Sequence, residues 1–281
     1  MPTLKDSVWL ISGCSTGFGR EIALAALEGG ALVAVTARNP TSVADICERF
    51  PEQAIALQLD VGSTEDIAVC VAATLARFGR IDALVNNAGY GYVAAIEEGE
   101  EDAVRALFDI NFFGALALTR AVLPVMRRQG SGHIINNSSQ AGIMANPGTG
   151  YYSASKYALE GLMEALQKEV SPLGIRVTSV QPGAFRTDWS GRSMQRSGVS
   201  IDDYKHVHKR LDMIAAIDGK QPGDPVRAAQ IFVDLYTMPE APAQLVLGAG
   251  ALATYRDKLR DVSAGLDRLE TLTTAADYPA A

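Results

Sequence analysis

Short apolar runs and amphipathic stretches alternate along most of the chain. The apolar runs, each of which predicts a β-strand, cover 8–12, 32–37, 54–60, 82–89, 132–139, 175–183 and 243–248. The stretches with helical periodicity cover 17–30, 42–50, 64–79, 100–113, 114–129, 151–171 and 224–237. Because the strands are continuously apolar, both faces of their sheet must be covered. The pattern predicts an α/β fold, a doubly wound parallel sheet of about seven strands with helices on both faces.

Two stretches depart from this alternation. Residues 189–222 are polar and contain SGRSMQRSGVSIDDYKHVHKR, which we interpret as a substrate-loop insertion. Residues 249–281 form a C-terminal extension, helical over 249–275. One face of this helix is apolar, because three- and four-residue steps separate Leu252, Tyr255, Leu259, Val262, Leu266 and Leu269. No repeat or linker-like run divides the chain, so residues 1–281 are predicted to form one domain.

Composition and charge narrow the range of functions. The net charge of −7 argues against a broad basic surface for nucleic acid. No apolar run approaches the ~20 residues of a membrane span, and the amino terminus lacks the features of a signal peptide. Cys14, Cys47 and Cys70 are odd in number and far apart, so we expect a reducing, cytoplasmic setting rather than disulfides.

Cysteine and histidine give no sign of a metal site. Cys14 lies in a glycine-rich loop, and we expect a small buried filler there rather than a reactive thiol. His133, His206 and His208 come without the cysteines or carboxylates that would complete a metal site. We interpret His206 and His208 as solvated helix residues, and we expect no bound metal.

A glycine-rich turn follows the first strand. The sequence SGCSTGFG places Gly13, Gly17 and Gly19 between that strand and the first helix. Glycines permit a tight turn and let the backbone approach a pyrophosphate, while the start of the helix offers free N–H groups and a positive dipole end. Such a turn can be purely structural, but its place at the first strand of a doubly wound sheet favours dinucleotide binding.

The end of the second strand bears on which dinucleotide binds. NAD-binding proteins carry an Asp or Glu there that holds the adenosine ribose hydroxyls. Here the strand ends in VAVTARNP, with Ala37 and Arg38 in that place. A guanidinium can bind a 2′-phosphate in two places, whereas a carboxylate would repel it. We therefore expect NADP(H) rather than NAD(H), unless Arg38 only stacks on adenine or is solvated. Asp60 is expected to accept from the adenine amino group or to cap the next helix.

Six motifs, in order, resemble those of the short-chain dehydrogenase/reductase family in its shorter branch. They are SGCSTGFG at 12–19, where the family has TGxxxGxG, NNAG at 86–89, Asn111 within DINFFG, NSS at 137–139, YSASK at 152–156 and QPGAFRT at 181–187. The resemblance covers about residues 7–250. Ser12 replaces the threonine of the family motif. The replacement keeps the hydroxyl and does not weaken the resemblance. The resemblance implies a Rossmann fold and hydride transfer between NAD(P) and an alcohol or carbonyl compound.

The family resemblance implies a catalytic set of Asn111, Ser139, Tyr152 and Lys156. The family's tyrosine and lysine are four residues apart on a helix and share one face. Only Tyr152 has a lysine four residues later, so Tyr151 is left for packing or the pocket wall. The family's serine lies 13 residues before its tyrosine, which selects Ser139.

Each member of this set has an implied role. Hydride transfer to a ketone makes an alkoxide that needs a proton, and a free tyrosine with a pKa of ~10 exchanges protons poorly near neutral pH. The Lys156 ammonium is expected to lower that pKa and to hold the nicotinamide ribose. Ser139 would polarise the carbonyl, and Asn111 would fix a water that links Lys156 to solvent. Taken alone, Asn111 could instead cap a helix bend, Ser139 could be a turn residue, and Tyr152 and Lys156 could be a surface pair.

The resemblance also implies which residues contact the cofactor. The backbone of 87–89 would pass the adenosine ribose, Pro182 and Gly183 would turn beside the nicotinamide, and Phe185 and Thr187 would hold the carboxamide. The expected cofactor residues are Gly13, Ser15, Thr16, Gly17, Phe18, Gly19, Arg38, Asp60, Val61, Asn87, Ala88, Gly89, Tyr152, Lys156, Pro182, Gly183, Phe185 and Thr187.

The substrate pocket is expected beyond the carboxyl ends of the strands. Its expected lining is Tyr90, Gln140, Met144, Tyr151, Trp189 and Met194. Several of these are aromatic or thioether side chains, which favours an apolar or aromatic ketone or alcohol over a phosphorylated sugar. The stretch PGAFRTDWSGRSM is similar to a subgroup of bacterial oxidoreductases loosely related to hydroxysteroid and retinol dehydrogenases.

Other functions and assemblies remain as alternatives. An NAD-preferring alcohol or hydroxysteroid-type dehydrogenase is the nearest. A non-catalytic NADP-binding sensor would be expected to lose Tyr152 or Lys156, a dehalogenase would replace Lys156, and the glycine spacing disfavours an epimerase. Many family members are tetramers. We expect a homodimer through helices 100–129 and 151–171, with the C-terminal helix packed on its own subunit over the tetramer site. That helix could instead join a partner subunit or close over the pocket.

Overall fold

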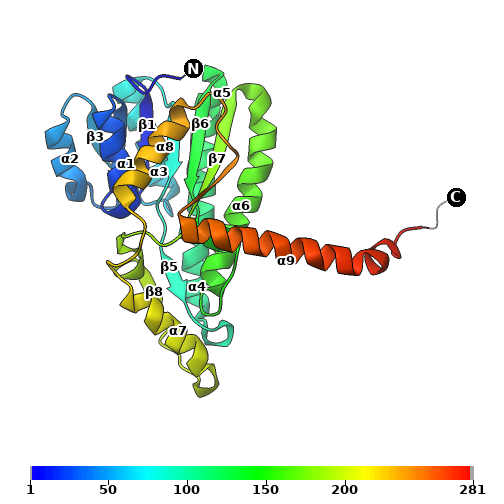
Figure 1. Ribbon diagram of the computed structural model, residues 1–281. Helices are drawn as coiled ribbons and strands as arrows, with labels where there is room; N and C mark the ends of the chain where they lie inside the picture. The colour runs from blue at the N-terminus through cyan, green and yellow to red at the C-terminus, as the bar shows by residue number, and fades with distance from the viewer. Residues whose placement is uncertain (1, 279–281) are drawn as a thin grey trace.

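Seven parallel strands form the central sheet of the computed structural model, which describes residues 2–278 (Figure 1). The strand order is β3-β2-β1-β4-β6-β7-β9. The strands are β1 (Val8–Ile11), β2 (Leu32–Ala37), β3 (Ala54–Gln58), β4 (Ala83–Asn86), β6 (Gly132–Asn137), β7 (Ile175–Pro182) and β9 (Gln244–Leu247). This confirms the predicted doubly wound α/β sheet. The order reverses between β1 and β4, and ligands of such sheets bind at that reversal.

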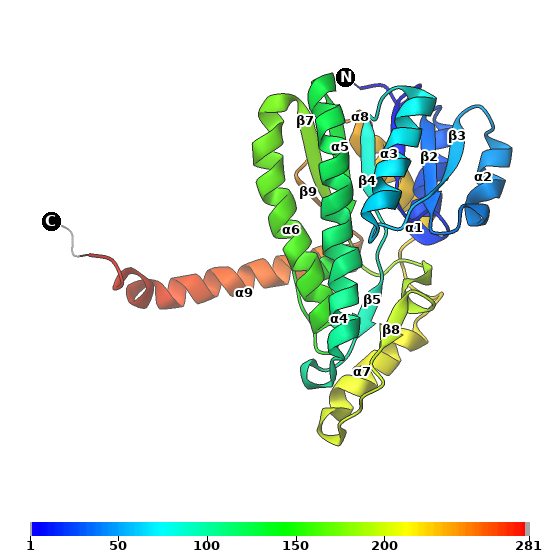
Figure 2. The same cartoon turned by 180° about the vertical axis from the view of Figure 1, so that it is seen from behind.

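Helices cover both faces of the sheet, as Figures 1 and 2 show from opposite sides. They are α1 (Gly17–Glu28), α2 (Ala44–Arg49), α3 (Thr64–Phe78), α4 (Glu101–Phe108), α5 (Ala115–Gln129), α6 (Gly150–Val170) and α8 (Pro225–Thr237). In β1, Trp9 and Ile11 pack in the core cluster that contains α1 and α8. Leu10 points the other way, into the cluster that contains α3, α5 and α6. This burial on both faces accounts for the continuously apolar strands.

The helices expected over 100–113 and 114–129 form one continuous helix. A π-helical turn at Asp109–Gly114 joins α4 to α5 and holds Asn111, which is 1% exposed; such turns often mark functional positions. The whole span Glu101–Gln129 is long and apolar enough to cross a membrane by length and composition alone, whereas the sequence had shown no such run. Its buried residues, including Leu118 and Met126, pack in the core beside the sheet, which accounts for their apolar character.

The polar insertion lies beyond the carboxyl edge of the sheet (Figure 1). Its strand β8 (Met194–Arg196) pairs in parallel with β5 (Gly91–Val93), and α7 (Lys205–Ala216) follows. Val207 and Leu211 of α7 pack against Val93 and Ala95. The two-stranded sheet was not predicted, because strands of three residues leave no periodic signal.

Helix α9 (Ala249–Thr274) runs past α6 and projects from the rest of the molecule (Figures 1 and 2). Leu259, Val262 and Leu266 on its apolar face are 53%, 49% and 63% exposed. The expectation that this face packs on its own subunit is therefore wrong. Residues 279–281 of the expected extension lie outside the described residues.

Candidate active site

A cavity of about 760 Å³ opens at the carboxyl ends of the strands. It extends from the glycine-rich loop to the insertion and includes the reversal point between β1 and β4. The catalytic candidates on its wall are Ser139, Tyr152 and Lys156. The predicted cofactor residues on its wall are Gly13, Ser15, Thr16, Gly17, Phe18, Arg38, Asp60, Val61, Asn87, Ala88, Gly89, Pro182, Gly183, Phe185 and Thr187. The fold thus brings segments from the whole family-like region into one site.

The glycine-rich loop has the geometry that a dinucleotide needs. Gly13 and Gly17 have φ angles of 74° and 60°, a region that favours glycine. Gly17 lines the cavity, and a Cβ built on it would only reach ordinary contact distance, 3.5 Å, from the Thr187 side chain. Helix α1 begins there without a side-chain cap or an acidic residue in its first turn, which leaves its N–H groups for an anionic group. Gly19 is buried behind the loop, where a Cβ would collide with the carbonyl oxygen of Gly13, and it serves packing.

Ser12 joins the glycine-rich loop to β4. Its Oγ accepts hydrogen bonds from the backbone N–H groups of Asn87 (2.9 Å) and Ala88 (3.0 Å). The Asn87 amide donates to the carbonyl oxygens of Ser12 (2.9 Å) and Gly13 (3.0 Å), and Asn137 donates to the Asn87 Oδ1 (2.9 Å). A serine hydroxyl is enough for these contacts, so the replacement of the family's threonine leaves the loop anchored.

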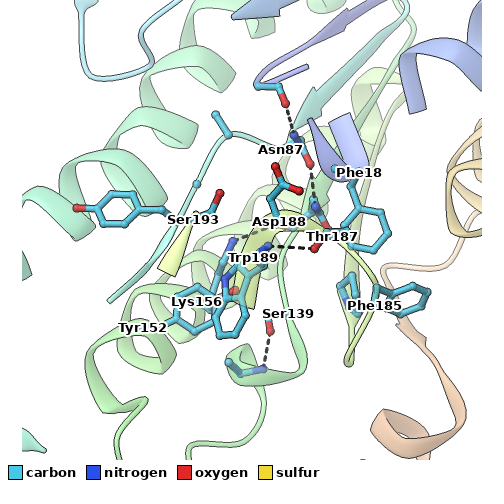
Figure 3. Close-up of a pocket in the computed structure, with 18 of the residues that line it drawn as sticks. Phe18, Asn87, Ser139, Tyr152, Lys156, Phe185, Thr187, Asp188, Trp189 and Ser193 are labelled. Atoms are coloured by element: carbon cyan, nitrogen blue, oxygen red, sulfur yellow. Dashed lines mark hydrogen bonds between the residues drawn. The ribbon is translucent and has the colours of Figure 1, made fainter. Parts of the chain in front are cut away.

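Tyr152 and Lys156 lie one turn apart on α6 and face the cavity together (Figure 3). They are 7% and 5% exposed, and the Lys156 Nζ lies 5.8 Å from the centre of the Tyr152 ring. The ammonium donates to the Asn137 carbonyl oxygen at 3.0 Å, which fixes its position. Ser139 lies just after β6 and caps a short 3₁₀ turn at Gln140–Gly142. The sequence therefore placed three catalytic candidates correctly in one cavity.

Burial sets the protonation states of this group. It raises the pKa of Tyr152 to about 12, and the neighbouring side chains of Ser139 and Trp189 lower that pKa only in part. Burial lowers the pKa of Lys156 to about 8, against the opposing effect of the Glu160 carboxylate. The expected lowering of the tyrosine pKa by Lys156 is not found, because loss of solvent dominates. The phenol is neutral at neutral pH and can act as a proton donor.

Asn111 lies behind the cavity wall. Its Oδ1 accepts from the backbone N–H of Tyr90 (3.0 Å), and its Nδ2 donates to the Tyr90 carbonyl oxygen (2.9 Å) and to the Ser155 hydroxyl (3.3 Å). A Cβ built on Gly89 would lie 2.9 Å from the Asn111 Oδ1 and 3.9 Å from the Lys156 Nζ. Asn111 thus holds the loop after β4 from within the helix bend, close to Lys156.

Four of the six residues predicted for the substrate wall line the cavity. The cavity wall includes Tyr90, Gln140, Met144 and Trp189. Tyr151 is not part of it, because the next residue on a helix points in another direction; its hydroxyl donates to the Ile96 carbonyl oxygen at 2.5 Å. Met194 is also outside, packed against the cluster that contains Val207 and Leu211. The ring of Trp189 lies 5.2 Å from that of Tyr152, centre to centre, and covers it (Figure 3).

Sequence reasoning missed several wall residues from the insertion. They are Arg192, Ser193, Gln195, Arg210, Ile214 and Ile217. The Arg192 Nη2 donates to the Thr16 hydroxyl and to Asp188, both at 3.0 Å, and so joins the insertion to the glycine-rich loop. Nothing in an irregular polar stretch indicates which side chains face inward. The one sequence feature that linked the insertion to the site was its position directly after the motif QPGAFRT at 181–187, which the family resemblance places beside the nicotinamide.

His208 also differs from its expected role. It is not a solvated helix residue, since its ring lies 2.7 Å from the Glu98 carboxylate and its side chain is 18% exposed. The same carboxylate accepts from the backbone N–H groups of Ile201 (2.7 Å) and Ala95 (3.2 Å). Glu98 therefore anchors the insertion to the loop that follows β5.

The residues that bear on the adenosine end differ in their surroundings. Arg38 is exposed at the cavity mouth and has no ion-pair partner among residues 2–278. The Asp60 Oδ1 accepts from the backbone N–H of Gly62 at 2.9 Å, while Ser63 caps α3.

Cys14 is fully buried, and burial raises the pKa of its thiol to about 12, which confirms its role as a small filler.

Comparison with known proteins defines the family. The family model for short chain dehydrogenases matches residues 7–197. Oxidoreductase BOA17 of Botryotinia fuckeliana (strain B05.10) is 35% identical over 261 residues, 92% of this chain and 95% of that protein. A short-chain dehydrogenase from Streptomyces avermitilis has 40% sequence identity and a TM-score of 0.92, over 98% of this chain and 100% of its own.

A third similar protein was solved with a nucleotide. The alcohol dehydrogenase from the archaeon Thermococcus sibiricus, complexed with 5-hydroxy-NADP, has 25% identity and a TM-score of 0.72, over 86% of this chain and 96% of its own. The motifs, the fold and the cavity agree with these comparisons. The chain therefore belongs to the short-chain dehydrogenase family and is an oxidoreductase of the kind that uses a NAD or NADP nucleotide.

Proposed function

We propose that this protein is an NADP(H)-dependent carbonyl reductase or alcohol dehydrogenase that interconverts a ketone or aldehyde and an alcohol. The observation that carries the proposal is the meeting of Ser139, Tyr152 and Lys156 with the glycine-rich loop in one cavity. A bound nicotinamide would supply or take up the hydride. The uncapped start of α1 and the cavity-lining backbone at Gly17 fit the pyrophosphate of such a group.

The chain's own residues would handle the proton. Ser139 would donate a hydrogen bond to the carbonyl oxygen of the substrate and so favour negative charge on it. Tyr152 would deliver its phenolic proton to the same oxygen, which its neutral state at neutral pH allows. Lys156, held by the Asn137 carbonyl, would bind the ribose hydroxyls and stabilise the phenolate that remains. Asn111 would hold the loop beside the lysine and the water that returns a proton to it.

The preference for NADP(H) is supported by charge at the cavity mouth. Arg38 is exposed there and unpaired within the described chain, and β2 ends without a carboxylate in the place where NAD-binding proteins have one. The guanidinium is free to bind a 2′-phosphate. The alternative is an NAD-preferring alcohol or hydroxysteroid-type dehydrogenase.

The wall near Tyr152 favours an apolar or aromatic small molecule. Trp189, Tyr90 and Met144 border this end, and Ile214 and Ile217 extend the apolar surface into the insertion.

We further propose a cytoplasmic homo-oligomer, with a dimer favoured over a tetramer. The cytoplasmic setting is supported by Cys14, Cys47 and Cys70, which are all free thiols.

The test is consumption of NADPH, followed by its absorbance, across a panel of aromatic, alicyclic and phosphorylated carbonyl compounds. We expect turnover with apolar ketones or aldehydes and a lower KM for NADPH than for NADH. The reverse reaction with the product alcohol and NADP⁺ serves as the internal control. Tight NADPH binding without turnover of any carbonyl compound or alcohol would favour the non-catalytic sensor instead.

A further inference from the structure

Helix α9 carries an apolar seam that the rest of residues 2–278 leaves largely exposed. The seam residues follow one another at alternating steps of three and four, which is the a and d spacing of a heptad repeat: Leu252, Tyr255, Leu259, Val262, Leu266 and Leu269. Leu252 and Leu269, near the two ends of the seam, are 40% and 46% exposed. A helix that projects from the molecule with such a seam is typical of one half of a coiled coil.

A different side of α9 rests on its own subunit. Ala251 is 3% exposed, and one heptad later the Lys258 ammonium donates to the Ile143 carbonyl oxygen and to the Tyr157 hydroxyl. These contacts hold the first turns of the helix against the body and fix its direction. The seam lies beside them and remains open to a second helix.

We propose that α9 pairs with α9 of a second copy of this chain as an antiparallel two-stranded coiled coil. When Leu259 lies opposite Val262 of the partner subunit, the regular spacing of the seam determines all the remaining facing pairs. Tyr255 then meets Leu266, and Leu252 meets Leu269, each pair occurring twice by symmetry. All seam residues are buried in one register.

Charge beside the seam selects the antiparallel arrangement. Arg256 and Glu270 both occupy e positions, and e positions face e positions in an antiparallel pair. The register above places Arg256 beside Glu270 of the partner subunit at both ends of the coil. In a parallel pair, Lys258 would meet Ser263 and Gly265 would meet Glu270, so no opposite charges would be joined. Neither Arg256 nor Glu270 has an ion-pair partner within residues 2–278.

The charge prediction is tested on the full-length chain by light scattering or sedimentation over a range of concentrations. Arg256→Glu and Glu270→Arg each place like charges together at both ends, so each should weaken this self-association by on the order of tenfold. The double variant Arg256→Glu/Glu270→Arg restores opposite charges and should restore the native mass. Arg268→Glu changes the same charge on the outer side of the coil and should have no effect.

The orientation is tested by cross-linking. The antiparallel register places Tyr255 opposite Leu266 of the partner subunit, so the double variant Tyr255→Cys/Leu266→Cys should form a covalent dimer on mild oxidation. Leu266→Cys alone should not, because only a parallel pair would place residue 266 opposite its own copy. Neither test has an activity readout, so its outcome is independent of the proposed reaction.

An apolar-to-charged variant decides whether the seam assembles copies at all. Leu259 is 53% exposed, so Leu259→Asp should leave the fold intact, as circular dichroism can show, and should halve the mass. An unchanged mass would overturn the proposal. So would a halved mass combined with no effect of the charge variants and no Tyr255→Cys/Leu266→Cys cross-link, because α9 would then dock on the body of another subunit.

Discussion

At the residue scale, Tyr151 and Tyr152 are adjacent in sequence but lie in different surroundings. Tyr152 lies against Trp189 in the cavity, whereas the Tyr151 hydroxyl is bound to the Ile96 carbonyl outside it. Tyr152→Phe should lower turnover by about 10²–10⁴, the usual worth of a general acid. Tyr151→Phe is the matched control and should retain turnover within severalfold. Steady-state kinetics with NADPH and the best ketone would measure both, and the opposite ranking would exclude Tyr152 as the acid.

The protonation state of Lys156 should appear in the pH profile. Its pKa of about 8 means that the ammonium is present below that pH and is lost above it. The rate of ketone reduction should therefore fall as the pH rises through about 8. The Glu160 carboxylate raises the pKa of Lys156, so Glu160→Gln should move this fall to lower pH. Glu164→Gln, on the exposed side of the same helix, should leave it in place. An alkaline limb that does not move would show that another group titrates.

Local spacing made the position of the candidate residues predictable, whereas their protonation states depend on residues that are distant in the sequence. The four-residue step from Tyr152 to Lys156 defines a helix face whatever surrounds it. The raised pKa of Tyr152 requires burial, to which Trp189 of the insertion contributes through its ring contact. No pattern in the sequence places that indole over the phenol. The error for Met194 has the same origin, since a three-residue strand does not reveal which side faces inward.

At the element scale, two groups of polar contacts help to attach the insertion to the rest of the chain. Glu98 binds the Ile201 backbone and His208 at the outer end, and Arg192 binds the Thr16 hydroxyl at the inner end. The inner contact joins the substrate side of the cavity to the glycine-rich loop. Strand and helix periodicity predicted the elements of the sheet, but it does not reveal polar contacts such as these.

Removal of the inner contact should loosen cofactor binding. The Arg192 side chain is 66% exposed, so Arg192→Ala should raise the Kd for NADPH by only about two- to fivefold, the range of an exposed polar contact. Arg196→Ala removes the exposed pair with Asp212 in the same insertion, away from the loop, and should leave the Kd unchanged. A fluorescence titration with NADPH measures both. Equal effects of the two variants would mean that the insertion responds as a whole rather than through Arg192.

At the scale of the whole molecule, the sheet was predictable for a reason that does not extend to α9. Double burial of the strands leaves apolar runs that can be seen directly in the sequence. The seam of α9 is equally clear, and its helix was expected at the right residues. An apolar helix face indicates that the face is buried against another surface, but it does not identify that surface. The expected packing on the same subunit was therefore wrong.

The cofactor preference can be measured on the whole molecule without a substrate. A ligand at about 100 times its Kd stabilises the folded state by about 2.7 kcal/mol, which should raise the Tm by roughly 5–10 °C for a chain of this size. We expect NADPH to give the larger shift at equal concentration. Arg38→Asp removes a charge-assisted contact worth about 1.5–3 kcal/mol and should reduce the NADPH shift while increasing that with NADH. Arg128→Asp, at the far end of α5, should change neither shift. Equal shifts with the two nucleotides in the unmutated protein would contradict the assignment of Arg38, because its guanidinium would then make no contact with the 2′-phosphate.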